Sequence, residues 1–274
     1  MIQLAERTWP EARILARDPR TVVLLPLGAV EEHGPHLPLL VDWLGSEELA
    51  RRMAPHLRRA GYRPVLAPAI PYGVSTLAAD WSGTVSLSVA TLRRLIVEVI
   101  QSLARHGFRR FVLANYQADP DHLRAMSQAR RVLERNRRLR VLYAGFAPGP
   151  RADRGMLDPR VLGLMQSPRP ECEWHSGEME TAVVLSRRPE LVRRGIARRL
   201  PPVWLDFRGR LRAGARRFRD IDPRARAAGY FGWPAAARPE TGEKAMALRG
   251  KLIARDITEA LGRRSRPRGR PHSH

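Results

Sequence analysis

Short apolar runs alternate along the chain with longer segments whose apolar positions repeat at helical spacing. Five runs predict strands, at residues 21–27, 65–70, 111–114, 140–146 and 181–186. Strands that are apolar at nearly every position are typical of a parallel sheet covered on both faces. The pattern therefore predicts an α/β fold, a three-layer α/β/α sandwich with a mainly parallel sheet. A functional site is expected where polar turns follow the strands.

The intervening segments predict four helices. The first has Ser46 as its N-cap, ends near Gly61 and is bent or shortened by a proline inside it. The second begins after Ser88, repeats apolar residues along one face and ends at Gly107. The other two are expected at residues 120–137 and 240–261.

The chain shows no internal repeat and no convincing linker, so residues 1–262 are expected to form a single domain. Residues 147–173 are rich in proline, glycine and arginine and predict a long loop over the site. Residues 187–237 are poorly periodic. Residues 263–274 are basic and contain no apolar residue to bury, which predicts a disordered tail.

The composition argues against a membrane-spanning protein and against a secreted one. The chain has 274 residues, of which 43% are hydrophobic, and no apolar stretch reaches the length of about 20 residues that a membrane span needs. The first residues lack the basic-then-apolar layout of a secretory signal. Because Cys172 is the single cysteine, an internal disulfide is excluded, and we expect a reducing, cytoplasmic location.

The net charge of +22 introduces an alternative, a nucleic-acid-binding protein, because a basic surface attracts phosphate regardless of sequence. All but Lys244 and Lys251 of the 49 basic residues are arginines, and these are scattered through the expected helices. The near absence of lysine favours a coding bias toward arginine. The scatter of the arginines along helices is typical of a solvated surface and not of a selected phosphate site. We therefore expect no specific nucleic-acid partner.

Candidate chemistry follows the first expected strand, in the segment that ends at Asp42. Glu31 and His33 are two residues apart, so an extended backbone points both side chains to one side, and Asp42 can return from the end of a short loop to meet them. Two carboxylates and an imidazole suit zinc or manganese. A surface loop that merely carries acids and histidines has the same pattern, and spacing alone does not separate the two interpretations.

Further motifs follow in order along the chain. Residues 31–38 read Glu-Glu-His-Gly-Pro-His-Leu-Pro, residues 82–87 read Ser-Gly-Thr-Val-Ser-Leu, and residues 175–181 read His-Ser-Gly-Glu-Met-Glu-Thr. Near the end, residues 229–234 read Gly-Tyr-Phe-Gly-Trp-Pro. Together these motifs resemble the signature of the creatininase family, and the chain is identified as a divergent member of that family.

The resemblance implies a metal-dependent amidohydrolase with two divalent ions, zinc or manganese, with iron as a further alternative. The implied ligands are Glu31 for one ion, His33 for the other and Asp42 as a bridge between them. His175 matches the position of a proton-transfer histidine. Glu178 and Glu180 would orient this histidine, or one of them would join the metal ligands.

The chain also departs from the family pattern. Where the family has Gly-His, this chain has Tyr116 and Gln117, so one metal-binding histidine is missing. The amide oxygen of Gln117 is a weaker ligand than imidazole, and we expect this second site to be weakened. Asp119 stands at a position for a carboxylate ligand and would complete the site of His33. His122 is either a substitute ligand or a surface residue.

The expected substrate contacts are Ser75, Tyr116 and Trp81. Ala78 replaces a histidine that relatives usually carry, which argues, with other changes, against creatinine as the substrate. Cys172 is more simply a packing residue than a nucleophile, because nothing near it in the sequence would activate the thiol.

The resulting hypothesis is an enzyme that hydrolyses a non-peptide carbon–nitrogen bond in an amide, formamide or cyclic amide with a metal-activated water. Its partners would be a small-molecule amide substrate and further copies of the chain, because the resemblance implies a homo-oligomer, commonly a hexamer. No membrane partner is expected. Two alternatives stay open: a degenerate family member with impaired metal binding that acts as a binding or scaffold protein, and the arginine-rich nucleic-acid-binding protein.

Overall fold

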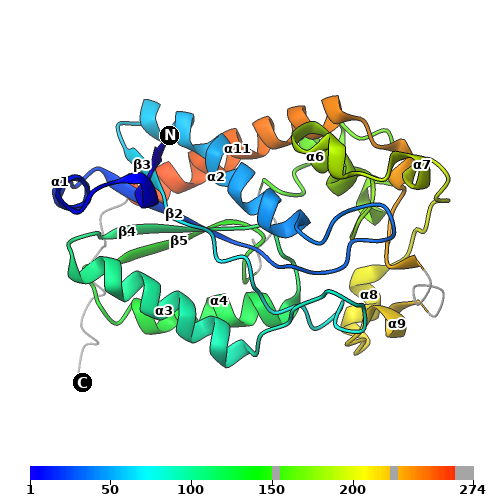
Figure 1. Cartoon of the computed structure of the whole chain (residues 1–274), viewed down its shortest axis with the longest axis horizontal. Coiled ribbons are helices and arrows are strands. Elements are labelled where there is room, and N and C mark those ends of the chain that lie inside the picture. Colours follow the sequence, from blue (N-terminus) through cyan, green and yellow to red (C-terminus); the bar gives the residue numbers. More distant parts are fainter. Residues whose placement is uncertain (150–154, 223–227, 263–274) are drawn as a thin grey trace, which may run out of the picture.

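A parallel sheet of five strands forms the centre of the protein (Figure 1). The structure is a computed structural model and describes residues 1–149, 155–222 and 228–262. The strand order across the sheet is β1-β3-β2-β4-β5, and every neighbouring pair is parallel. The strands are β1 Ile2–Gln3, β2 Thr21–Leu27, β3 Arg63–Leu66, β4 Arg110–Asn115 and β5 Arg140–Gly145.

The residues of β2 show how the sequence produces the layers. Every side chain of this strand is buried. Val22 and Leu24 belong to one hydrophobic core, whereas Val23 and Leu25 belong to another on the opposite face. Successive side chains of a strand point to opposite faces, so a strand that is apolar at nearly every position requires a covering layer on each side.

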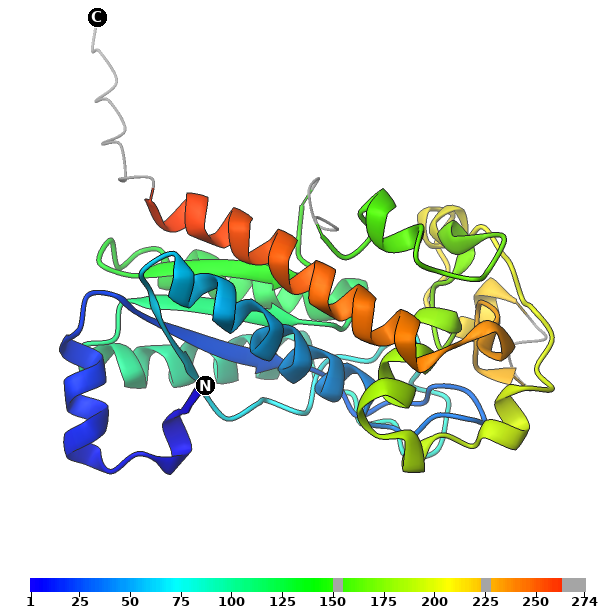
Figure 2. The same cartoon turned by 90° about the horizontal axis from the view of Figure 1, so that it is seen from above.

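Helices provide these two layers. On one side of the sheet lie α2 (Val41–Arg59) and α11 (Pro239–Gly262), and on the other lie α3 (Val89–Arg105) and α4 (Pro120–Leu133) (Figure 1). Seen from above, α11 runs along the length of the molecule, and α1 (Trp9–Arg17) lies at the end away from α6 to α9 (Figure 2). The predicted three-layer α/β/α sandwich with a parallel sheet is confirmed.

The helix α2 begins earlier than the sequence pattern predicts. It starts at Val41, so Ser46 lies inside the helix and not at its N-cap. The hydroxyl of Ser46 donates a hydrogen bond to the carbonyl oxygen of Leu27 and accepts one from the backbone N–H of Tyr116, at 2.9 Å. A Cβ at the neighbouring Gly45 would lie 2.5 Å from the Tyr116 ring, so only glycine allows this close approach. Ser46 thus ties α2 to the ends of β2 and β4.

The strand predicted at residues 181–186 is wrong, because these residues belong to the helix α6 (Glu178–Arg187). This helix packs against both α2 and α11, so its apolar residues are buried on more than one side. A short apolar run that is buried all round cannot be distinguished from a strand by periodicity. The correction places Glu178 and Glu180 in the first turn of a helix.

The remaining elements are short or differ at their ends. Ser88 caps α3 as predicted, with its hydroxyl accepting a hydrogen bond from the backbone N–H of Thr91 at 3.1 Å. The short helices are α5 Pro159–Leu162, α7 Arg194–Ala197, α8 Phe207–Arg212 and α9 Phe218–Ile221, with 3-10 turns at Leu4–Glu6, Pro170–Cys172, Pro189–Leu191 and Pro234–Ala236. No helix within the described ranges is long and apolar enough to cross a membrane. The predicted tail, residues 263–274, lies outside the described residues.

Candidate metal centre

Two groups of ligand-type side chains meet beyond the C-terminal end of β2. Glu31, His33 and His175 form the first group, and His33, Asp42 and Glu180 the second; within each, the ligand atoms lie within 4.8 Å of one another. The loop after β2 supplies Glu31 and His33, the first turn of α2 supplies Asp42, and the segment that enters α6 supplies the other two. The structure therefore brings Glu31, His33 and Asp42 together, as the sequence spacing predicts.

The imidazole of His33 presents an atom suited to a cation. Its Nδ1 lies 3.1 Å from the carbonyl oxygen of Glu31, and because a carbonyl oxygen only accepts, Nδ1 carries the hydrogen and Nε2 the lone pair. This Nε2 lies 3.8 Å from Asp42 Oδ1 and 3.8 Å from Glu180 Oε2. Both Nε2 and Asp42 Oδ2 are buried without a hydrogen-bond partner in the described part of the chain. Metal-binding histidines are commonly held in this way.

The charges of the site also fit a cation. Burial raises the pKa of Glu31 to about 7. Burial, together with the charges of Glu31 and Glu180, raises the pKa of Asp42 well above its usual range, and burial lowers the pKa of His33 well below its own. Buried carboxyl groups so close together resist ionisation unless a positive charge compensates them. A divalent ion would provide that charge, so the residues present fit one.

His175 is held by Glu32, a residue that the sequence pattern does not single out. The Nε2 of His175 lies 3.0 Å from the backbone carbonyl oxygen of Glu32 and 3.3 Å from its Oε1, so Nε2 carries a hydrogen. The other carboxylate oxygen of Glu32 accepts a hydrogen bond from the N–H of Gly34 at 2.8 Å. Burial alone lowers the pKa of His175, but the hydrogen bond and charge of Glu32, with two further carboxylates, raise it to about 9. The imidazole is therefore protonated at neutral pH.

The metal-free protein is expected to lose stability as the pH rises through neutrality. The raised pKa of Glu31 stabilises the fold fully below its usual value of 4.5, and this contribution is lost as the pH approaches about 7. The contribution of His175 is complete below 6.5 and is lost as the pH approaches about 9. Metal binding has the opposite dependence, because the ligands must be deprotonated. Burial lowers the pKa of His33, His36 and His122, so these residues take up protons on unfolding below about pH 7 and oppose the trend there. Thermal unfolding between about pH 7 and 9 should show a falling Tm without metal and a widening gain on adding metal; a constant gain would contradict this.

Glu180 takes the position beside His33 that the sequence analysis gives to Asp119. Its Oε2 also accepts a hydrogen bond from the backbone N–H of Ser176, at 2.5 Å. Ser176 has a φ of 53°, a left-handed conformation that a non-glycine residue rarely adopts. Strain of this kind persists where the surrounding structure imposes it, often at functional sites. The strained backbone of Ser176 directs its N–H toward the carboxylate of Glu180, a candidate ligand.

Glu178 has a different role from the one predicted. Its two carboxylate oxygens accept hydrogen bonds from the backbone N–H groups of Gln166, at 2.7 Å, and Ser167, at 2.6 Å. Both oxygens are thus engaged in fixing the loop before α6. The contact with His175 that the sequence analysis assigns to Glu178 is made by Glu32.

Gln117 and Asp119 lie next to the two groups. The amide nitrogen of Gln117 donates a hydrogen bond to Glu31, while its amide oxygen accepts one from the backbone N–H of Asp119 at 3.1 Å. The carboxylate of Asp119 accepts hydrogen bonds from the N–H groups of Leu77, at 2.9 Å, and Asp121, at 2.8 Å. Asp119 lies outside both groups. The ligand roles of Gln117 and Asp119 stay predictions.

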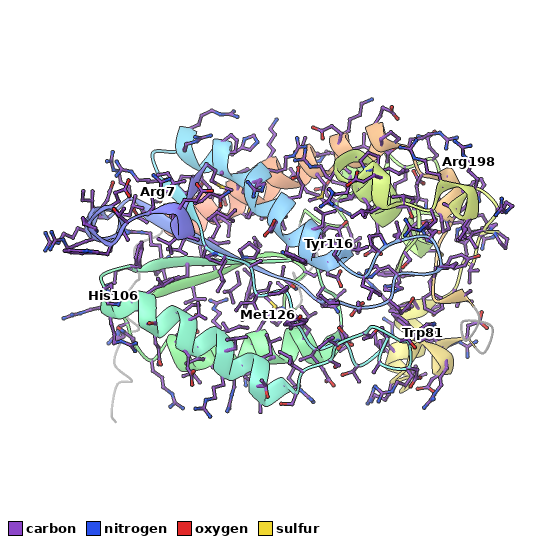
Figure 3. The ribbon with its side chains drawn as sticks, viewed as in Figure 1. Arg7, Trp81, His106, Tyr116, Met126 and Arg198 are labelled. Carbon is purple, nitrogen blue, oxygen red and sulfur yellow. The ribbon has the colours of Figure 1, made fainter. Side chains whose placement is uncertain are left out.

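Three other residues named in the sequence analysis, Ser75, Trp81 and His122, have different surroundings. Ser75 Oγ lies 3.4 Å from Nε2 of Gln117. Trp81 packs edge-on against Phe218, with ring centroids 5.9 Å apart, at the end of the molecule that carries α8 and α9 (Figure 3). His122 is fully buried, and its Nδ1 accepts a backbone N–H bond at 3.3 Å, so it is not a surface residue. It also lies outside both ligand groups.

The half-buried Cys172 has no feature that activates a nucleophile. Burial and the nearby carboxylate of Glu171 raise the pKa of its thiol, which keeps the sulfur protonated. An activated cysteine requires the opposite shift. The structure supports the expectation that Cys172 packs and does not attack substrate.

A cavity of about 180 Å³ lies beside the two ligand groups. Glu31, His175 and Glu180 form its polar wall. Tyr116, which lies at the base of α2 (Figure 3), also lines it, and its hydroxyl accepts a hydrogen bond from Arg249 at 3.0 Å. Apolar side chains line much of the rest, among them Leu77, Phe146, Leu157, Phe207, Leu211 and Phe218. Of the three expected substrate contacts, Tyr116 alone lines this cavity.

The fold and the site define an α/β protein with a buried carboxylate and histidine centre that suits a divalent metal, next to a cavity for a small molecule. A profile of the creatininase family, described as creatinine amidohydrolase, matches residues 5–257. The chain belongs to the creatininase family. Family membership and the ligand groups together support a metal-dependent hydrolase of the amidohydrolase type.

Individual relatives show how far the chain has diverged. It is 32% identical to the creatinine amidohydrolase of Pseudomonas putida over 203 residues, which cover 69% of this chain and 73% of that protein. It is 29% identical to the mycofactocin precursor peptide peptidase of Mycobacterium ulcerans over 189 residues, or 68% of this chain and 61% of the peptidase. A crystal structure of creatininase superimposes with a TM-score of 0.73 at 26% identity, covering 96% of this chain and 99% of that one. A manganese form of creatininase gives 0.72 at 27% identity, covering 96% and 99%.

Proposed function

We propose that this protein hydrolyses a non-peptide carbon–nitrogen bond in a small-molecule amide, formamide or cyclic amide, with the help of bound divalent metal. The observation that carries this proposal is the buried Nε2 of His33, which faces two carboxylates 3.8 Å away and has no hydrogen-bond partner among the described residues. A buried lone pair without a donor costs stability unless something binds it. A metal ion at this point would satisfy it.

The ligand groups suggest how the metal is held. His33 has one free ring nitrogen and can bind one ion, together with Asp42 and Glu180, while Glu31 would hold a second. Two ions, zinc or manganese, are therefore the proposed content, with iron as a further alternative. The hydrogen bond from Gln117 to Glu31 supports the view that the ion beside Glu31 is bound more weakly. Metal bound there supplies a Lewis acid and lowers the pKa of a water molecule.

The residues of the chain supply the proton transfer. His175 lines the cavity, and the hydrogen bond and charge of Glu32 raise the pKa of its imidazole, so it can give a proton to the departing nitrogen. Because its Nε2–H is engaged by Glu32, Nδ1 is the atom that can release and take up this proton. Glu32 acts as a positioning residue that fixes the ring and stabilises its charged form. Glu178 fixes the loop that precedes α6.

The cavity favours an amide with an apolar substituent. Apolar side chains line it opposite the polar wall of Glu31, His175 and Glu180. A compact polar substrate such as creatinine would leave polar groups unpaired against these walls, which costs binding energy. An aryl or branched alkyl group would instead bury apolar surface there. This supports the expectation that creatinine is not the substrate.

Metal-loaded protein is expected to hydrolyse simple N-aryl amides such as formanilide faster than creatinine. The protein would be stripped with a chelator, reloaded with zinc or manganese, and assayed by release of the amine. Activity should disappear on chelation and return on reloading, because the described residues that line the cavity include no serine, threonine, cysteine or lysine to attack the amide in place of a metal-activated water. A dipeptide amide in the same assay separates a non-peptide amidase from a peptidase.

The hydrogen bond between Gln117 and Glu31 also favours a second candidate function, a binding protein without metal. In that case the carboxylate of Glu31 is already occupied by an amide donor. Reloaded protein that retains no metal in elemental analysis would overturn the hydrolase and support this alternative. The single domain, hexameric assembly and cytoplasmic location stay predictions.

A further inference from the structure

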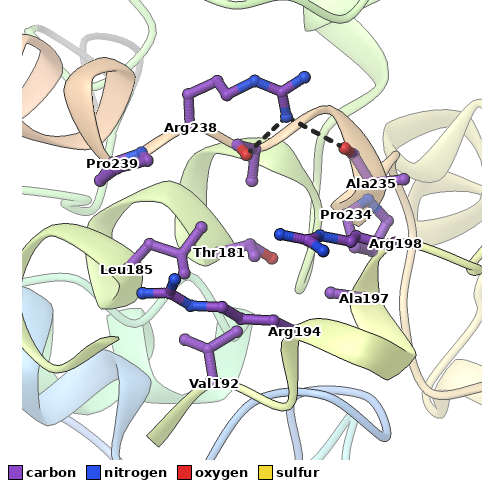
Figure 4. A pocket seen from close by; sticks show the side chains of 11 residues that line it. Thr181, Leu185, Val192, Arg194, Ala197, Arg198, Pro234, Ala235, Arg238 and Pro239 are labelled. Atoms are coloured by element: carbon purple, nitrogen blue, oxygen red, sulfur yellow. Dashed lines mark hydrogen bonds between the residues drawn. The ribbon is translucent and has the colours of Figure 1, made fainter. Parts of the chain in front are cut away.

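A second cavity, of about 310 Å³, lies between α6, α7 and the segment that leads into α11 (Figure 4). None of its eleven lining residues also lines the cavity beside the ligand groups. The function proposed above does not use it.

Three guanidinium groups surround this cavity, and no acidic residue lines it. The arginines are Arg194 and Arg198 on the α7 segment and Arg238 before α11. Within the described ranges, the guanidinium groups of Arg194 and Arg198 make no hydrogen bond or ion pair, whereas Arg238 donates to backbone carbonyl oxygens, the shortest at 3.1 Å from Ala237. Several uncompensated positive charges around one hollow raise the local concentration of anions.

Several arginines elsewhere on the protein are paired with carboxylates. Arg94 pairs with Glu98 and Arg130 with Glu134, one helical turn away in each case, at 2.6 Å. Such pairs are typical of solvated helix faces. Other arginines, such as Arg58 and Arg93, also make no ion pair within the described ranges, and a larger hollow lined by four arginines has no acidic lining residue either. The second cavity differs in its connection to the loop that carries His33.

The floor of the cavity is apolar. Leu185, Val192, Ala197 and Pro234 line it beside the arginines. The fully buried Thr181 also lines it, and its hydroxyl lies 2.8 Å from Nε2 of His36. Guanidinium groups recognise carboxylate and phosphate oxygens, while an apolar floor favours a carbon skeleton next to the anionic group.

The wall of this cavity is connected to the loop that carries His33. Val192 packs against Leu37 and Val41, and the backbone N–H of Arg193 donates a hydrogen bond to the carbonyl oxygen of His36 at 2.8 Å. A ligand that draws the α7 arginines together would therefore stiffen the segment that supports the candidate metal centre.

We propose that this second cavity binds a small organic anion, a phosphate monoester or a carboxylate with an apolar group, at a site separate from the metal centre. The binding itself does not depend on the hydrolase activity. Bound anion would stabilise the loop of His33 and His36 through Val192 and Arg193.

The test is calorimetric titration of the full-length, metal-loaded protein with phenyl phosphate and with inorganic phosphate, at constant ionic strength. Phenyl phosphate should bind more tightly, because it also buries an apolar ring. The double variant Arg194→Gln/Arg198→Gln should weaken binding at least about tenfold, because it removes two charge-assisted contacts. The matched control Arg193→Gln/Arg199→Gln changes neighbouring arginines that do not line the cavity and should stay within about twofold. Arg194→Lys/Arg198→Lys should lie between the two.

Three results would overturn the proposal. The first is equal affinity of the parent and of Arg194→Gln/Arg198→Gln, and the second is loss of phosphate binding in a metal-ligand variant, Asp42→Asn, which would place the anion on the metal. The third is a change of oligomeric mass in the glutamine pair, which would make the cavity a contact between copies of the chain. The Tm of each variant without anion shows that it is folded, which is expected for exposed arginines.

Discussion

Replacing Asp42 by asparagine is expected to remove metal binding and with it hydrolysis. The side chain is buried in the first turn of α2, and its Oδ1 lies 3.8 Å from His33 Nε2. Asparagine keeps the shape and loses the charge that a divalent ion needs. Loss of an outer partner of a metal site commonly costs about 10–100-fold in affinity, so loss of a ligand should cost at least about a hundredfold. Elemental analysis and amide hydrolysis measure both effects.

The same substitution is expected to stabilise the metal-free protein. Burial and the charges of Glu31 and Glu180 raise the pKa of Asp42, so its ionised form is unfavourable without a cation. A neutral amide removes that penalty, and the Tm without metal should be equal or higher while the gain in Tm on adding metal disappears. Glu47→Gln, on the same helix, should leave both quantities unchanged. Metal content equal to that of the parent would refute the assignment of Asp42 as a ligand.

Glu32→Gln is expected to lower kcat about 10–100-fold while KM changes little, because general acid catalysis as a whole contributes about 10²–10⁴-fold. The amide can still contact His175, but it removes the charge that raises the pKa of that imidazole to about 9. The pKa should fall toward its usual value of 6.5. The upper limb of the pH–rate profile should therefore move to lower pH in the variant.

The matched control for this prediction is Glu178→Gln in the neighbouring motif. Glu178 accepts backbone hydrogen bonds from Gln166 and Ser167, so its substitution should lower the Tm and leave the pH–rate profile in place. A profile that stays unchanged in Glu32→Gln, or that moves equally in both variants, would show that Glu32 has only a structural role.

The sheet and its covering helices could be predicted because their signals are local. Every position of β2 is buried and all but Thr21 are apolar, and Ser88 stands at a helix N-cap that the structure confirms. The helix α6 could not be predicted from its pattern, since its burial comes from α2 and α11, which lie far away in the sequence. Ser46 was misleading for a similar reason, because its hydrogen bonds go to Leu27 and to Tyr116 and not to its own helix.

The candidate site was partly predictable, because one part of it depends on local alternation and the other on contacts between distant segments. Alternation along an extended segment places Glu31 and His33 on one side, and the structure brings both to the ligand groups. The same alternation points Glu32 the other way, toward His175, whose approach from a distant segment no spacing reveals. The available signal was that Glu32 stands between two candidate ligands, as the middle one of three consecutive ionisable residues. The choice between Asp119 and Glu180 as the neighbour of His33 also required the tertiary structure.

The two ligand groups draw on only two stretches of the chain, residues 31–42 and residues 175–180. An ion coordinated by both stretches would act as a reversible cross-link between the entrance of α2 and the entrance of α6. Removing it would free the two loops from each other while leaving the sheet intact, so a protease should cut the stripped protein first at these loops. The ion would then determine whether these two loops are rigid, in addition to supplying chemistry.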